Sequence, residues 1–125
     1  SRYSDVGRHP ENESVPGALI VRVEAGLFYF NAGHVRDQVR SLLAASTDGL
    51  KLVVWDLSTS PNIDLAGARL IGDVQREVAS RGAALRVVDA HSSVRDLIRK
   101  VVGTSVGEVS RRLSIEDALA ETAPR

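Results

Sequence analysis

The stretch VVWDLSTSPNIDLAGARLIG, Val53 to Gly72, constrains the fold more than any other part of the sequence. In this stretch an apolar run is followed by a polar loop that contains a proline, and the loop is followed by a helical pattern. The run from Leu52 to Trp55 has no polar interruption, which indicates a strand buried on both faces of a sheet. The helical pattern follows at Leu70, Ile71, Val74 and Val78. A buried strand followed by a helix is the repeating unit of α/β folds, which often place their chemistry in the connecting loop.

Strand-like and helix-like segments alternate along most of the chain. Strands are expected at 18–24, 27–30, 50–57 and 83–90. Helices are expected after Asn31, after Asp64 and after Ser93, with a short last helix from Ser114 to Leu119. Residues 103–112 are ambiguous and leave room for an edge strand. Because the turn at 25–26 is short, the first two strands should form a hairpin. The order predicts a mainly parallel sheet with one antiparallel component.

The composition excludes several classes of protein. A length of 125 residues fits one domain, and its 16 basic and 16 acidic side chains leave no positive excess for nucleic acid. The chain has no cysteine, so it forms no disulfide or zinc–thiolate site. No apolar run approaches the roughly 20 residues that span a bilayer, and no signal-peptide pattern is present. Because the first residue is Ser1, we expect either removal of an initiator methionine or a piece of a larger protein.

No catalytic or metal-binding motif emerges. The histidines His9, His34 and His91 lie far apart, and neither a phosphate-binding loop nor a nucleophile elbow is present. Asp56 and Asp64 flank the loop, but one should accept loop N–H groups at a strand end and the other should cap a helix. We therefore predict no enzyme activity, no catalytic residue, no metal and no cofactor.

Two other features bear on ligands. Phe28 and Phe30 should share one face of a strand, while Tyr29 points to the other face. One of these two faces is expected in the core, and the other is a candidate contact surface. Trp55 is expected in the core. The helix starts after Asn31 and Asp64 present backbone N–H groups that suit an anion or a nucleotide phosphate, although Asp64 itself would oppose an anion.

The segment WDLSTSPNIDLAG resembles the signature of the STAS domain, which is named for sulfate transporters and anti-sigma-factor antagonists. The stretch RHPENESVPGALIVRVEAGLFYFNAGHVRDQV, Arg8 to Val39, is similar to the entry of this domain in SulP-type anion permeases. The resemblance implies a mixed, mainly parallel sheet of about four or five strands, with about four or five helices packed mainly on one side. It also implies a position after a membrane transport domain.

The resemblance singles out the residues around the two helix starts. In the antagonist branch the serine directly after the loop aspartate is phosphorylated, and that position here is Leu65, which has no hydroxyl. The shape is therefore expected to remain as a docking loop without the charge switch. The candidate ligand, anion or partner-binding loop consists of Phe30, Asn31, Ala32, Ser58, Asp64, Leu65, Ala66 and Gly67.

The leading interpretation is a non-catalytic cytoplasmic regulatory domain of a SulP-like transporter for sulfate, bicarbonate or dicarboxylate. Its partner would be its own transmembrane domain, at the cytoplasmic face of the inner or plasma membrane. STAS homodimer contacts, soluble regulatory proteins, and a nucleotide or small anion stay open. The alternatives are a stand-alone anti-sigma-factor antagonist and a nucleotide or anion sensor. Residues 1–17 are expected to be a lead-in, 18–122 the STAS domain and 123–125 a tail.

Overall fold

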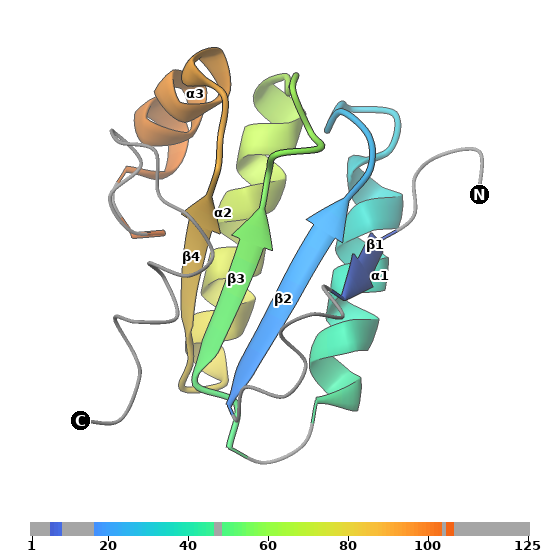
Figure 1. Ribbon diagram of the computed structural model, residues 1–125, viewed down its shortest axis with the longest axis vertical. Helices are drawn as coiled ribbons and strands as arrows, with labels where there is room; N and C mark the ends of the chain where they lie inside the picture. The colour runs from blue at the N-terminus through green and yellow to red at the C-terminus, as the bar shows by residue number, and fades with distance from the viewer. Residues whose placement is uncertain (1–5, 9–16, 47–48, 104, 107–125) are drawn as a thin grey trace.

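A computed structural model of the chain describes residues 6–8, 17–46, 49–103 and 105–106 (Figure 1). These residues form four strands and three helices in the order β-β-α-β-α-β-α. The strands are β1 (Val6–Arg8), β2 (Ala18–Val23), β3 (Leu52–Asp56) and β4 (Ala84–Val88). The helices are α1 (Ala32–Ala45), α2 (Leu65–Ser80) and α3 (Ser92–Val102). None of these helices is both long and apolar enough to cross a bilayer.

The strands form one mixed sheet in the order β1-β2-β3-β4. β1 is antiparallel to β2, whereas β2, β3 and β4 are parallel, with Val21, Trp55 and Val87 in register across them. This confirms the predicted α/β class and the mainly parallel sheet. The three parallel strands end at the same edge of the sheet, where Figure 1 shows the loops that lead to the helices. We call this the carboxyl edge.

The predicted hairpin between residues 18–24 and 27–30 is wrong. The antiparallel partner of β2 is β1, which lies in the segment expected to be a lead-in. Leu27 makes only an isolated parallel bridge to Ile63, and residues 29–31 form a turn. The segment does not fold back onto β2 because Leu27 is fully buried and bonds with the loop after β3.

The main core lies between one face of the sheet and the helices. All five residues of β3 are buried, which confirms the predicted two-sided burial, and Trp55 is a core residue as expected. Buried side chains from α1, α2 and α3 all belong to this one core, so the described helices pack on one side of the sheet. The opposite face buries a smaller cluster, formed by Ile20, Leu52, Val54 and Val88.

The helix ends follow local sequence signals to different degrees. α2 begins after Asp64 and ends before Gly82, whose φ of 78° suits glycine, as predicted. α3 begins at Ser92, earlier than the start expected after Ser93. His91 is its N-cap residue, and no side chain makes a capping hydrogen bond there.

The last helix expected from Ser114 and most of the ambiguous segment 103–112 lie outside the described residues. Within them, the amide of Val87 donates to the carbonyl oxygen of Val106 over 3.2 Å.

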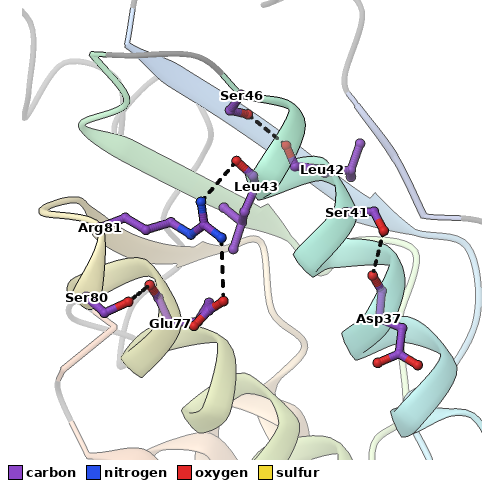
Figure 2. Close-up of polar contacts among 8 residues, drawn as sticks. All are labelled: Asp37, Ser41, Leu42, Leu43, Ser46, Glu77, Ser80 and Arg81. Atoms are coloured by element: carbon purple, nitrogen blue, oxygen red, sulfur yellow. Dashed lines mark hydrogen bonds and ion pairs between the residues drawn. The ribbon is translucent and has the colours of Figure 1, made fainter.

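Helices α1 and α2 are joined at the edge opposite the carboxyl edge by one long side chain (Figure 2). The Arg81 Nη1 donates to the carbonyl oxygen of Leu43 over 3.4 Å, and its Nη2 lies 3.6 Å from Glu77 Oε1. A cation at the last carbonyls of a helix is electrostatically favourable. This contact therefore joins the C-terminal ends of both helices.

Candidate functional site

The loop after β2 and the loop after β3 are bonded to each other along their backbones. The amide of Leu27 donates to the carbonyl oxygen of Asn62, and the amide of Asp64 donates to that of Leu27, both over 3.0 Å. These bonds form the isolated parallel bridge between Leu27 and Ile63. Two segments that are more than thirty positions apart therefore make one unit, which we call the loop pair; it consists of residues 26–31 and of residues 61–67, the last three of which begin α2.

Asp64 joins the loop pair through both carboxylate oxygens. Its Oδ1 accepts the amide of Gly67 over 2.9 Å, which confirms the predicted helix cap of α2. Its Oδ2 accepts the amide of Tyr29 over 3.0 Å. The same side chain thus starts a helix and positions the loop before α1. It also places a negative charge where an anion would approach the N-terminus of α2.

Asn31 lies at the predicted N-cap position of α1, but its side chain does not cap that helix. Its Oδ1 accepts the amide of Phe28 over 2.9 Å, and its Nδ2 donates to the carbonyl oxygen of Gly26 over 2.9 Å. Asn31 is buried, so these bonds are shielded from water. Its role is to close the loop between β2 and α1.

Two glycines allow the loops to approach this closely. A Cβ atom on Gly67 would lie 2.3 Å from the carbonyl oxygen of Leu27, and one on Gly26 would lie 2.9 Å from that of Asn62. Both distances are shorter than nonbonded contacts permit, and a Cβ atom on Gly26 would also lie 2.4 Å from the ring of Phe28. The glycines at 26 and 67 are therefore a packing requirement of the joined loops. Ala32 and Ala66 are half-buried beside them.

Three large apolar side chains of the loop pair point into solvent. Tyr29 is 79% exposed, Phe30 58% and Leu65 46%. The ring of Phe30 stacks on Phe28 with centroids 5.5 Å apart and meets Tyr29 edge-on at 5.7 Å. The expectation that one face of this segment belongs to the core is wrong, because Phe28 is only half-buried and Phe30 is exposed. We call Tyr29, Phe30 and Leu65 the apolar patch.

The serines after β3 do not take part in this arrangement. The amide of Ser58 donates to Asp56 Oδ1 over 2.9 Å, which confirms the predicted role of that aspartate. The hydroxyls of Thr59 and Ser60 both donate to the carbonyl oxygen of Val23, over 2.8 and 2.9 Å. Ser58 is exposed, and its carbonyl oxygen lies 3.5 Å from His91 Nε2. Of the predicted site residues, Ser58 is thus the one whose contacts lead away from the loop pair.

Parts of this site differ from what the sequence predicts. Tyr29 is expected on a strand, whereas it lies in a turn and its amide donates to Asp64 Oδ2. Leu27 and Gly26 were not singled out at all. The signal that the sequence offered for this contact was Gly26 itself, since a glycine beside a strand often marks a close approach of another backbone. Within the described residues, no three His, Cys, Asp or Glu side chains are grouped closely enough to hold a metal.

Comparisons with known proteins agree with this architecture. The family model described as STAS domain matches residues 9–110. Sulfate transporter 1.2 of Arabidopsis thaliana is 22% identical over 134 aligned residues, which cover 100% of this chain and 20% of the transporter. The chain therefore spans about a fifth of the length of this curated relative.

Two solved structures share the fold. Murine Solute Carrier 26 family member A9, an anion transporter in the inward-facing state, aligns with a TM-score of 0.73 and 21% identity, covering 90% of this chain and 19% of that one. The anti-sigma factor antagonist SpoIIAA in its unphosphorylated form aligns with a TM-score of 0.67 and 14% identity, covering 94% and 95%. Since the family model matches most of the sequence, the chain belongs to the STAS domain family.

Proposed function

We propose that the chain is a non-catalytic regulatory and interaction domain of a SulP-like inorganic anion transporter. Curated relatives are named sulfate transporters, and the chain aligns with only 20% of the length of one of them. In this proposal the remaining length forms the transmembrane domain, which carries sulfate, bicarbonate or a dicarboxylate. The domain works at the cytoplasmic face of the membrane. The expected bounds of 18–122 extend on the N-terminal side to β1, because Val6–Arg8 pairs with β2, and we propose a tail at 123–125.

The observation that carries the interaction role is the apolar patch on the loop pair. Tyrosine and other aromatic residues dominate the binding energy of many protein interfaces. The backbone bonds of Leu27 and the two bonds to Asp64 fix the loops before any partner arrives. A preorganised surface loses less conformational entropy on binding than a loose one. We infer that the patch contacts the transport domain or a soluble regulatory protein.

The first experiment concerns the full gene product. An antibody against this domain should detect, in membranes of native cells, a protein several times heavier than 13.4 kDa that only detergent extracts. A small soluble band would contradict the transporter assignment.

The second experiment concerns the patch itself. Combined Tyr29→Ser, Phe30→Ser and Leu65→Ser substitutions in the full-length protein should change anion uptake by about fivefold or more at equal membrane levels, since hot-spot contacts would be lost. The matched control replaces three exposed alanines of α1 and α2, Ala44, Ala45 and Ala79, by serine. Equal uptake by the unaltered protein, the patch variant and the alanine-to-serine control would contradict a regulatory role of the patch.

A stand-alone anti-sigma-factor antagonist is the second candidate, supported by the structural likeness to SpoIIAA. The residue after Asp64 is Leu65, which offers no hydroxyl to a kinase. Incubation with a cognate kinase and ATP, followed by intact-mass measurement, separates the candidates. Stoichiometric phosphorylation would favour the antagonist, and an unchanged mass is the outcome that we expect.

A nucleotide or anion sensor is a further alternative for the same loops. The Asp64 carboxylate already accepts the amide of Gly67 at the start of α2, so an anion there would meet a negative charge. Calorimetric titration with GTP, ATP and sulfate tests this alternative. We expect neither heat nor a shift in melting temperature.

A further inference from the structure

One face of the sheet is buried although none of the described helices lies over it. Side chains alternate between the two faces of a strand, and four apolar ones point away from the core that α1, α2 and α3 share. They are Ile20, Leu52, Val54 and Val88, which we call the opposite-face cluster. Figure 1 views the sheet from this face, with α2 behind the strands. Each of the four side chains is nevertheless no more than 3% exposed.

The neighbours of the cluster on the same face do not account for this burial. Arg86 lies in register beside Val54, and Arg22 lies in register beside Asp56. Both arginines are themselves only half-buried. A sheet face that is open to water leaves its side chains accessible, whereas a covered face does not. The residues that the structure describes therefore do not supply the cover of this cluster.

The chain leaves the described region at the edge of the sheet. The carbonyl oxygen of Val106 accepts the amide of Val87 over 3.2 Å, and Val106 is fully buried. Because β4 is the last strand in the sheet order, this bond places Val106 at the free edge of β4. Neighbouring strands are about 4.8 Å apart, so β2 lies roughly 10 Å from that edge. A few residues after Val106 are enough to cross this distance.

Composition favours residues 107–125 over the other segments outside the described part. Residues 9–16 contain a single large aliphatic side chain, Val15, and residues 1–5, 47–48 and 104 contain none. The segment 107–125 contains four, namely Val109, Leu113, Ile115 and Leu119. A segment that excludes water from an apolar cluster gains stability only if it is itself apolar on one side.

The spacing within residues 107–125 provides such a side. The helix expected from Ser114 would bring Ile115, Ala118 and Leu119 onto one face, because they are three and four positions apart. The acidic residues of the same stretch would lie on the remaining sides: Glu116, Asp117 and Glu121. A helix of this kind can cover a sheet with its apolar face and keep its carboxylates in water.

We propose that residues 107–125 fold back over the opposite-face cluster, with Ile115 and Leu119 against the side chains around Val54. The segment crosses the edge of β4 after Val106 and gives the parallel strands a cover on both faces, as parallel sheets require. It closes this face to other proteins and leaves the apolar patch as the exposed contact surface. The inference holds for the domain whether or not it regulates a transporter.

A spin label on the full chain tests this position. Because the sequence has no cysteine, Ala120→Cys gives one attachment site, on a side of the expected helix that points away from Ile115 and Leu119. We expect the label to broaden the NMR amide signals of β2, β3 and β4 more than those on the exposed sides of α1 and α2. The matched control carries the label at Ala79→Cys, an exposed position of α2, and should reverse this order.

Substitution of the covering side chains gives an independent measurement. Ile115→Asp with Leu119→Asp should lower the melting temperature by about 10 °C or more, because the cluster would lose its cover or bury two carboxylates. The matched control adds the same two charges with Leu65→Asp, at an exposed apolar position, and Ala120→Asp. The control should shift the melting temperature by no more than about 4 °C. If the first variant does not fold, the spin-label experiment still decides.

Two results would overturn the inference. One is broadening by the Ala120→Cys label that spares the strands, and the other is an equal melting temperature of the two double variants. A mixture of labelled chains with unlabelled, nitrogen-15-enriched chains identifies the remaining source of a cover. Broadening of the strand signals in that mixture alone would assign the cover to a second copy and would also overturn the inference. None of these results changes the outcome of the patch substitutions, which test the proposed function separately.

Discussion

The two ends of the α1–α2 layer are joined by different means. At the carboxyl edge, the loops that precede the helices meet backbone to backbone, with Leu27 bonded to Asn62 and Asp64 and with Gly67 against the carbonyl of Leu27. At the opposite edge, the helix ends meet through the side chain of Arg81 (Figure 2). The first contact leaves no room for an additional atom. The second spans its gap with a chain of rotatable bonds.

This difference indicates which edge tolerates change. A close backbone contact cannot relax without moving a helix or a strand, whereas a long arginine can adopt another rotamer and leave its partners to water. The apolar patch is on the constrained edge. We expect substitutions there to separate clearly into those that break the loop pair and those that alter only its exposed surface.

Gly67→Ala should have the largest effect. The added Cβ would lie 2.3 Å from the carbonyl oxygen of Leu27, which must move together with its loop. We expect a loss of about 3 kcal/mol in the free energy of unfolding, measured by urea denaturation. The control is Gly33→Ala in α1, where the nearest atom is an arginine nitrogen at 4.0 Å. This control should be neutral or stabilising by up to about 1 kcal/mol. Equal losses would refute the contact.

Asp64→Ala should have the next largest effect, because it removes the helix cap and the bond to Tyr29 together. We expect a loss of about 2 kcal/mol, with faster hydrogen exchange at the amides of Tyr29 and Gly67. Asp73→Ala is the control on the same helix, since Asp73 makes an exposed pair with Arg76. The control should lose no more than about 0.5 kcal/mol. Unchanged exchange at Tyr29 would contradict the role of Asp64 in joining the loops.

Arg81→Ala tests the tolerant edge. Arg81 and Glu77 are both partly exposed, and the bond to Leu43 is long at 3.4 Å. We expect a loss of about 0.5 kcal/mol, reduced at high salt, in the same denaturation assay. Arg76→Ala, at another exposed pair of α2, serves for comparison. A loss as large as that of Asp64→Ala would remove the contrast between the two edges.

Leu65→Ser should have the smallest effect on stability, within about 0.5 kcal/mol, because nearly half of this side chain already faces water. Leu70→Ser on the buried face of the same helix should lose about 3 kcal/mol. Thermal and urea unfolding of both variants measure the difference. A severe loss in Leu65→Ser would mean that Leu65 supports the fold and is not a free contact.

Much of the fold was predictable because its signals are local. The apolar run Leu52–Trp55 identified the central strand, and Asp64 identified the start of α2, since capping depends on residues within one turn. The prediction of a strand at 27–30 is wrong. It rested on the general preference of aromatic residues for strands. Pairing with Ile63 overrode that preference, and nothing near Leu27 in the sequence indicates its partner.

The sequence by itself determined the α/β order, the buried strand β3, the cap of α2 and the absence of a hydroxyl at Leu65, because each depends on residue type or on short spacing. Only the tertiary structure decided that β1 pairs with β2 and that Asp64 holds Tyr29. It alone showed that Tyr29, Phe30 and Leu65 are exposed on the two joined loops. These features join residues far apart in the chain, and their geometry follows from how the whole core packs.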